Sequence, residues 1–213
     1  MAVVIMAGYP YSGKTEFCKM VSAELDKRNM KCLHLTPSNY ISDNYWSLES
    51  DLQKADMVSA WNKCSEELSK NMSNKNNTIL FDTCGSNLES ISKYVPLLKH
   101  NGHKVIYVFV AAHVNECRER AKDNWISNDT MIRYQNEFNK SVFTMKRLSD
   151  RFFFVKNIND VNKVNLKSNA IKVAEAINGE IGGIRKPKPI HSADNRPRQT
   201  NNKRPEIRKN RPV

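Results

Sequence analysis

The amino-acid sequence predicts an α/β protein in which a parallel β-sheet is covered by helices on both faces. Short apolar runs alternate with segments whose apolar residues recur at helical spacing, and a glycine-rich octet at residues 8–15 joins the first run to the first helical segment. In folds of this class ligands bind at the carboxyl ends of the strands. The 213 residues suit one domain that can bury a core without a metal ion or a disulfide.

The first two strands and two helical regions are predicted within residues 1–72. Residues 3–7 form an apolar run that suits a buried strand, and residues 16–25 form a helix with one apolar face. A second strand is predicted at 31–35, and a long helical region from about 45 to 72. Its apolar residues recur at roughly helical spacing, so we expect them to face the core: Leu48, Leu52, Ala55, Val58, Trp61 and Leu68.

Three further strands and four helices complete the predicted fold. The strands are expected at residues 78–82, 104–111 and 151–155. The helices are expected at residues 88–100, 115–125, 130–148 and 166–178. Pro96 should start a kink or a new turn, because proline lacks a backbone N–H. In the helix at 130–148 the expected buried residues are Ile132, Phe138, Val142 and Leu148.

The octet at residues 8–15 reads Gly-Tyr-Pro-Tyr-Ser-Gly-Lys-Thr and matches the phosphate-binding motif G-x-x-x-x-G-K-[ST]. Because Gly8 and Gly13 carry no Cβ, the loop can fold its backbone N–H groups around a phosphate, and the following helix adds its positive N-terminal dipole. Ser12 belongs to the same nucleotide-contacting loop. Lys14 is expected to reach the β- and γ-phosphates, while Thr15 offers a hydroxyl to Mg²⁺. The sequence therefore predicts that the chain binds ATP and Mg²⁺.

Three further side chains are candidates for phosphoryl transfer. Asp82 ends a buried strand, where a carboxylate can hold Mg²⁺ directly or through water. Arg120 and Arg133 lie in a basic segment that suits a lid, and a lid arginine can stabilise the charge that develops on the transferred group. Arg118 and Arg120 cannot both point to the phosphate, because residues two apart on a helix diverge, and we favour Arg120.

The base for the acceptor hydroxyl has two candidates. Asp43 lies in the loop after the second strand, although a turn or helix-capping role suits it equally well. Asp82 could serve instead. His34, His100 and His103 lack the companion ligands of a metal site, so none is predicted beyond Mg²⁺.

Over about residues 1–150 the chain resembles the P-loop kinases that phosphorylate hydroxyls, and among them the kinase domain of phage-type polynucleotide kinase. The resemblance lies in four segments: Gly8 to Thr15, Asp82-Thr83, Glu116 to Arg120 and Met131-Ile132-Arg133. It implies a three-layer P-loop kinase fold with a helical lid. It also implies nucleotide-binding roles for Lys14 and Thr15 and lid-arginine roles for Arg120 and, less directly, Arg133.

The chain departs from the pattern of that family at two places. Ser38-Asn39 stands where the family carries a catalytic Asp, and Asn124 stands at the second lid arginine. The octet is also similar to that of seryl-tRNA kinase and related tRNA-modification ATPases, and the kinases of 5-hydroxymethyluracil in DNA share the same core. The resemblance therefore identifies the phosphate donor side and leaves the acceptor open.

Most of the net charge of +12 lies at the end of the chain. Residues 185–213 contain ten Lys and Arg against Asp194 and Glu206, which gives this segment +8 and leaves +4 for residues 1–184. The segment also contains five prolines and few apolar residues, so we expect a disordered tail at 185–213 after a kinase domain at 1–184. A flexible basic segment suits a nucleic-acid partner. A solvated tail is the equal alternative, and contact with an anionic membrane is a weaker one.

We therefore expect a kinase that transfers the γ-phosphoryl group of ATP to a hydroxyl of a nucleic acid. That hydroxyl would be a 5′ end or a hydroxymethylated base such as 5-hydroxymethyluracil. The alternatives are a nucleotide-dependent regulator that binds RNA or tRNA, and a kinase of nucleosides or metabolites. The five cysteines are odd in number and form no C-x-x-C pair, and no apolar run has the length of a membrane span, so we expect reduced thiols in a cytoplasmic protein.

Overall fold

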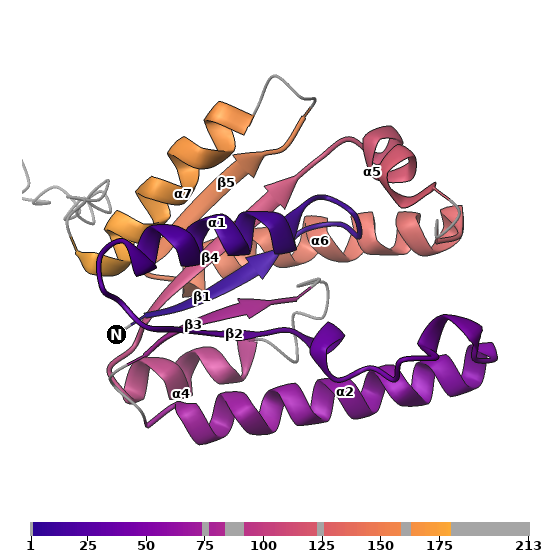
Figure 1. Ribbon diagram of the computed structural model, residues 1–213, viewed down its shortest axis with the longest axis horizontal. Helices are drawn as coiled ribbons and strands as arrows, with labels where there is room; N and C mark the ends of the chain where they lie inside the picture. Colours follow the sequence, from indigo (N-terminus) through magenta and orange to yellow (C-terminus); the bar gives the residue numbers. More distant parts are fainter. Residues whose placement is uncertain (1, 74–76, 84–91, 123–125, 159–162, 180–213) are drawn as a thin grey trace, which may run out of the picture. The chain divides into compact units, whose positions relative to one another are not determined.

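The computed structural model describes residues 2–73, 77–83, 92–122, 126–158 and 163–179. Within these residues five parallel strands form one sheet in the order β2-β3-β1-β4-β5 (Figure 1). The strands are β1 (Ala2–Ala7), β2 (Cys32–Leu35), β3 (Thr78–Asp82), β4 (Lys104–Ala111) and β5 (Arg151–Lys156). The predicted α/β class is confirmed, and each predicted strand is found to within one residue at either end.

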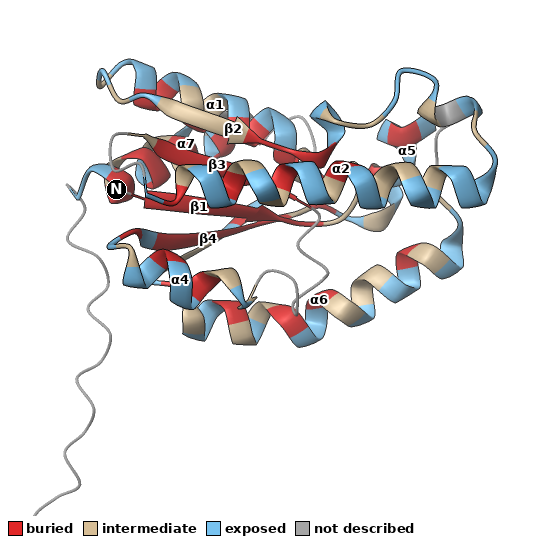
Figure 2. Ribbon diagram, turned by 90° about the horizontal axis from the view of Figure 1, so that it is seen from below, coloured by how far each residue is buried: buried red, intermediate tan, exposed pale blue. Residues whose placement is uncertain are grey.

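Helices cover both faces of this sheet. On one face, α1 (Lys14–Asp26) and α7 (Lys163–Asn178) pack on alternate residues of the central strand, including Val4 and Met6. On the other face, α2 (Ser50–Asn71), α4 (Tyr94–His100) and α6 (Asn128–Leu148) pack on Val3 and Ile5. All six residues of β1 are buried, and Figure 2 shows the buried residues gathered in the strands. This double coverage explains why the strands read as continuous apolar runs.

The predicted core-facing stripe of α2 is wrong over the first half of the helix. A short 3₁₀ turn at Tyr45–Ser47 precedes it, and the helix itself begins at Ser50. Leu52 and Val58 are 55% and 60% exposed, and Ala55 is exposed too. The buried stripe is Ala60, Cys64 and Leu68. In Figure 1 the first half of α2 extends past the carboxyl ends of β2 and β3, so it has no sheet to pack on.

The first half of α6 departs from its prediction for another reason: its buried side runs through Met131 and Phe138, which leaves Ile132 on another side of the helix. Ile132, which was predicted to be buried, is 54% exposed, whereas Phe138 is 1% exposed as predicted. Val142 and Leu148 are half-buried against the face of the sheet that α6 covers. The helix was predicted correctly, but Ile132 was assigned to the wrong side of it.

The remaining helices agree with their predictions where they are described. The structure describes α4 from Tyr94 to His100, which places Pro96 in the first turn. Proline is tolerated there, because the backbone N–H groups of a first turn make no hydrogen bond within the helix. α5 (Val114–Ala121) follows β4. The predicted helical residues 88–91 and 123–125 lie outside the described residues, as does the predicted tail at 185–213.

Two general features concern the helices and the thiols of the described chain. None of the described helices combines the length and the apolar character that crossing a membrane requires. Cys18, Cys32, Cys64 and Cys117 carry free thiols. Cys84 lies outside the described residues.

Candidate functional site

The octet connects the carboxyl end of β1 to the first turn of α1, and its glycines are required by a close neighbour at Gly8 and by a left-handed backbone at Gly13. A Cβ on Gly8, whose φ is 151°, would lie 2.3 Å from the carbonyl oxygen of Val110 in β4. A Cβ on Gly13, whose φ of 91° is left-handed, would lie 2.3 Å from Nδ2 of Asn157. Gly13 is also the N-cap of α1 and has no side chain with which to cap it. The N–H groups of the first turn are therefore available to an anion.

Two polar side chains of the octet are buried inside it. The Nζ of Lys14 donates a hydrogen bond of 2.8 Å to the carbonyl oxygen of Tyr9, and Lys14 is 9% exposed. Ser12 is fully buried, and its Oγ has no hydrogen-bond partner among the described residues. An unsatisfied buried hydroxyl costs about 1–3 kcal/mol. The loop thus holds a cation and an unsatisfied donor close together, which suits a phosphate ligand.

Thr15 and Asp82 meet at the junction of the octet with β3. β1 pairs with β3 so that Met6 lies opposite Asp82, which brings the end of β3 beside the start of the octet. Oγ1 of Thr15 donates a hydrogen bond of 2.7 Å to Oδ2 of Asp82, whose side chain is 3% exposed. A hydroxyl and a carboxylate in contact are oxygen ligands of the kind that Mg²⁺ prefers.

His34, for which no role was predicted, lies beside this pair. Its Nε2 is buried, lacks a hydrogen-bond partner among the described residues, and is 3.6 Å from Oδ2 of Asp82. β2 pairs with β3 so that His34 lies opposite Leu80, two residues before Asp82 and on the same face. The alternation of side chains along a strand could have revealed this position, but only once the strand order was known.

Arg120 lies against the octet, whereas Arg118 points elsewhere. In the last turn of α5, Arg120 donates hydrogen bonds to the carbonyl oxygens of Tyr11, at 3.4 Å, and of Asn157, at 3.1 Å. It also lies 3.7 Å from a carboxylate oxygen of Glu116. Arg118 donates instead to the side chain of Asn128. The structure therefore places one arginine of the lid, which we define as α5 and the first turns of α6, beside the predicted phosphate site.

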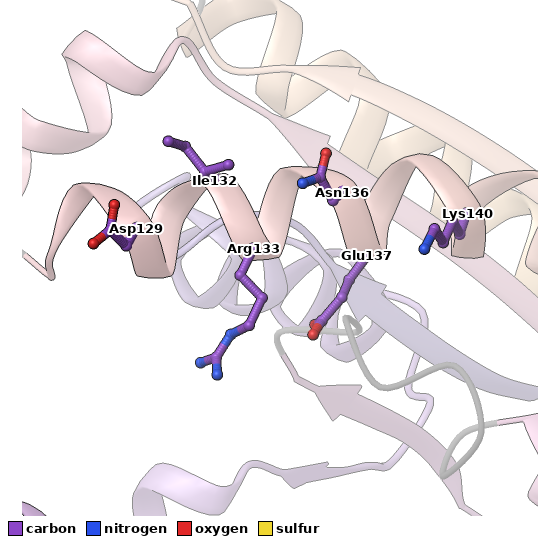
Figure 3. Close-up of a pocket in the computed structure, with 6 residues that line it drawn as sticks. All are labelled: Asp129, Ile132, Arg133, Asn136, Glu137 and Lys140. Atoms are coloured by element: carbon purple, nitrogen blue, oxygen red, sulfur yellow. The ribbon is translucent and has the colours of Figure 1, made fainter.

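Arg133 is exposed on α6 and has no described contact with the octet. Its guanidinium lies 5.9 Å from the centre of the Tyr134 ring. Figure 3 shows Arg133 and Glu137 pointing to the same side of the helix. A hollow of about 450 Å³ runs along this part of α6, lined by Asp129, Ile132, Arg133, Asn136, Glu137 and Lys140. One helix supplies all of these residues, so the hollow is a groove on the lid rather than an enclosed site.

Asp43 is exposed in the loop between two 3₁₀ turns, Pro37–Asn39 and Tyr45–Ser47. The preceding residue fixes this loop to α2, because the N–H and Oγ of Ser42 each donate a hydrogen bond of 2.8 Å to Asp56. These bonds lower the pKa of the Asp56 carboxyl. Among the described residues, no contact joins Asp43 to Lys14 or Asp82. Asn124, the other position of interest in the lid, lies outside the described residues.

The octet and the lid also share a small apolar cluster. Its members are Ala112, Cys117 and Met131, with Tyr9, Tyr11, Val114 and Ile126 packed against them. Tyr9 packs edge-on against Phe138 as well, with ring centres 5.1 Å apart. Burial raises the pKa of the Tyr9 and Tyr11 phenols and of the Cys117 thiol. The two tyrosines of the motif are therefore uncharged packing residues that join the loop to the lid.

Three kinds of comparison relate this chain to known proteins. The family described as Zeta toxin matches residues 2–171. No curated protein matches the chain in sequence. Several solved structures share its fold.

The shared fold is that of kinases and of a related nucleotide-binding protein. The APS kinase of Mycobacterium tuberculosis, solved with AMPPNP and APS, is 12% identical with a TM-score of 0.53, over 83% of this chain and 97% of that one. The shikimate kinase of Acinetobacter baumannii, solved with shikimate, is 11% identical with a TM-score of 0.53, over 86% and 96%. Kti12 of Chaetomium thermophilum, solved with ADP-AlF3, is 14% identical with a TM-score of 0.50, over 82% and 98%. At these identities the comparisons show the fold alone.

Proposed function

The chain belongs to the Zeta toxin family of P-loop kinases, and from this premise we propose that it transfers the γ-phosphoryl group of ATP to a hydroxyl of a nucleic acid. The observation that carries the proposal is the contact between Thr15 and Asp82 at the end of a loop in which Gly8 and Gly13 leave no room for a larger residue without strain. A simple anion site has no need of an acid beside the loop hydroxyl. A kinase needs both groups, because the phosphates that it binds carry a divalent cation.

On the donor side, each residue of the octet has a separate role. The N–H groups of the loop and of the first turn of α1 bind phosphate oxygens, and Lys14 leaves the carbonyl oxygen of Tyr9 to contact the β- and γ-phosphates. Thr15 and Asp82 would hold Mg²⁺, which when bound neutralises charge on the β- and γ-phosphate oxygens. Arg120 lies beside the loop, where its guanidinium can stabilise charge on the oxygens of the transferred group.

On the acceptor side, we propose Asp43 as the base that accepts the hydroxyl proton. It is exposed, and the bonds between Ser42 and Asp56 hold its loop in place. Asp43→Asn should lower kcat by about 100-fold or more and leave the KM for ATP unchanged. Asp51→Asn is the matched control, because Asp51 is 94% exposed at the start of α2. If Asp43→Asn behaves like this control, the role of base passes to Asp82.

The nucleic-acid acceptor is supported by the charge of the chain. The net charge is +12 and the pI is about 9.5, and the C-terminal segment 185–213 carries +8 of that charge. Removing this segment should weaken the binding of an oligonucleotide and reduce its salt dependence by about one unit of slope for each phosphate contact that is lost. Unchanged affinity and slope would leave the tail without a part in acceptor binding.

A panel of acceptors with one stock of γ-labelled ATP tests the proposed reaction. The acceptors are 5′-OH DNA, 5′-OH RNA, DNA that contains 5-hydroxymethyluracil, tRNA and free nucleosides. Label on an oligonucleotide supports the proposal and identifies the hydroxyl. Label released only as inorganic phosphate, and faster with tRNA, would instead indicate a nucleotide-dependent RNA-binding regulator.

A kinase of small molecules is the second candidate. Two solved structures of this fold, the APS kinase and the shikimate kinase, were determined with small molecules bound. This candidate predicts label on nucleosides or other small acceptors, and none on the oligonucleotides of the panel. It also predicts that removal of residues 185–213 leaves kcat/KM unchanged.

A further inference from the structure

Asn157 directly follows β5 and contacts the octet from a distant part of the chain. Its backbone N–H donates to the carbonyl oxygen of Ala111 at 2.7 Å, which continues the pairing of β5 with β4. Its side-chain Nδ2 donates a hydrogen bond of 2.8 Å to the carbonyl oxygen of Ser12, 145 residues away in sequence. The same Nδ2 would lie 2.3 Å from a Cβ on Gly13. The amide of Asn157 therefore packs directly on the peptide between Ser12 and Gly13.

The backbone carbonyl of Asn157 contacts the lid. It accepts the hydrogen bond of 3.1 Å from Arg120, which also donates to the carbonyl oxygen of Tyr11 at 3.4 Å. Asn157 is thus bonded to the octet through its side chain and to the lid arginine through its backbone. The two contacts can be tested separately, because a side-chain substitution removes only the first.

The bond to Ser12 determines the direction of a backbone donor. In a planar trans peptide the C=O and the next N–H point in opposite directions, and the chain contains no cis peptide bond among its described residues. The carbonyl of Ser12 points to Asn157, so the N–H of Gly13 points away from it. Without the amide of Asn157, this peptide could rotate and turn its carbonyl oxygen toward an incoming phosphate.

We propose that Asn157 is a positioning residue of the phosphate site. Its amide fixes the peptide between Ser12 and Gly13 with the N–H directed to the nucleotide phosphates, and its carbonyl holds Arg120 beside the loop. This inference rests on the proposed binding of ATP and does not depend on the identity of the acceptor.

The test compares the binding of AMPPNP with Mg²⁺ by calorimetry, using the full chain. Asn157→Ala should weaken binding about five- to tenfold, the range for one lost hydrogen bond of ordinary strength. Asn157→Asp should weaken it further, because a carboxylate oxygen would face the carbonyl oxygen of Ser12. Asn169→Ala is the matched control, since Asn169 makes the same kind of bond, 2.8 Å to Asn165, on the exposed side of α7. It should bind AMPPNP as the wild type does.

Thermal unfolding without nucleotide separates a positioning role from a merely structural one. Asn157→Ala should unfold close to the temperature of the wild type while its affinity for AMPPNP falls. An Asn157→Ala variant that binds AMPPNP as tightly as the wild type, or one that loses binding only because it no longer folds, would overturn the inference. If the wild type itself binds no AMPPNP, the proposed function fails first. The two failures are therefore distinguishable.

Discussion

Thr15 and Asp82 are 67 residues apart in sequence, and the hydroxyl of one donates a 2.7 Å hydrogen bond to the carboxylate of the other. The pairing of β1 with β3 creates this contact, because it places Asp82 opposite Met6, two residues before the octet. The same carboxylate oxygen lies 3.6 Å from Nε2 of His34. One buried acid thus lies among a hydroxyl donor, an imidazole and the phosphate loop.

Asp82→Asn should separate the charge of this residue from its shape. The amide oxygen of Asn can still accept the bond from Thr15, so the midpoint of thermal unfolding should change little. Without the negative charge, the rate should fall about 100-fold or more, and the Mg²⁺ concentration for half-maximal rate should rise. Rates measured over a range of Mg²⁺ concentrations test this. A Mg²⁺ dependence identical to that of the wild type would contradict it.

Lys14→Ala should abolish turnover while the protein stays folded. The ammonium makes one described hydrogen bond, to the carbonyl oxygen of Tyr9, and such a bond contributes about 1 kcal/mol to stability. Loss of the ammonium beside the phosphates has a much larger effect, and should lower the rate about 100-fold or more. Steady-state kinetics and thermal unfolding measure the two effects. Lys19→Ala, on the exposed side of the same helix, is the control. A Lys14→Ala variant with near-normal rate would mean that the loop is only structural.

Arg120→Ala and Arg118→Ala should differ sharply although the two residues are neighbours on α5. Arg120 contacts the octet, whereas Arg118 contacts Asn128. Loss of Arg120 should lower kcat about 100-fold, and Arg118→Ala should remain close to the wild type. Arg120→Lys should not restore the rate, because a single ammonium cannot replace a planar guanidinium that donates from two nitrogens. Equal losses in the two alanine variants would indicate a general effect on the lid.

Gly8→Ala should destabilise the fold through a steric clash with β4. The new methyl group would lie 2.3 Å from the carbonyl oxygen of Val110, and backbone cannot rotate away as a side chain can. The expected loss is about 1–3 kcal/mol in the free energy of unfolding. Gly102→Ala separates the clash from backbone strain, because its φ is 79° but no atom lies within 4 Å of the added Cβ. Urea unfolding should rank Gly8→Ala as the less stable variant, and the reverse order would contradict the prediction.

The thiols should differ in their reactivity toward iodoacetamide at pH 8. Burial raises the pKa of Cys64 to about 12 and raises the pKa of Cys18 and Cys117 as well, so few thiolates form at these positions. Cys32 is only partly buried. Among the described thiols, mass spectrometry of the labelled peptides should find Cys32 modified before Cys18, Cys64 and Cys117, and all of them modified in urea. As the pH is raised, the buried thiols should begin to react only at a higher pH than an ordinary thiol, because their pKa is raised. Labelling of Cys64 as early as Cys32 in the folded protein would contradict this prediction.

The fold was predictable from the sequence because each strand is an apolar run and most helices keep a clear period. The errors at Leu52, Val58 and Ile132 have two causes. Leu52 belongs to the first half of α2, which extends past the sheet. Val58 and Ile132 lie off the buried sides of their helices, which run through Ala60 and Cys64 in α2 and through Met131 and Phe138 in α6.

The sequence predicted the loop and two residues outside it, Asp82 and Arg120, that contact the octet. Gly8 to Gly13 form the loop, and Lys14 and Thr15 begin α1. His34 and Asn157 were missed because their contacts with Asp82 and Ser12 depend on which strands are neighbours. Strand order is a property of the assembled sheet. Asp43 and Arg133 remain predictions, since no described contact joins either residue to the octet.

The octet contacts the ends of three different strands, and this has a consequence for the order in which the molecule assembles. Thr15 bonds to Asp82 at the end of β3, Gly8 packs on Val110 of β4, and Asn157 after β5 bonds to Ser12. The loop therefore has all of these contacts only once the last strand has joined the sheet. A nascent chain that ends before residue 157 therefore lacks a finished phosphate site. Because a ligand stabilises only the state that binds it, nucleotide would act as a late check that the whole sheet is in place.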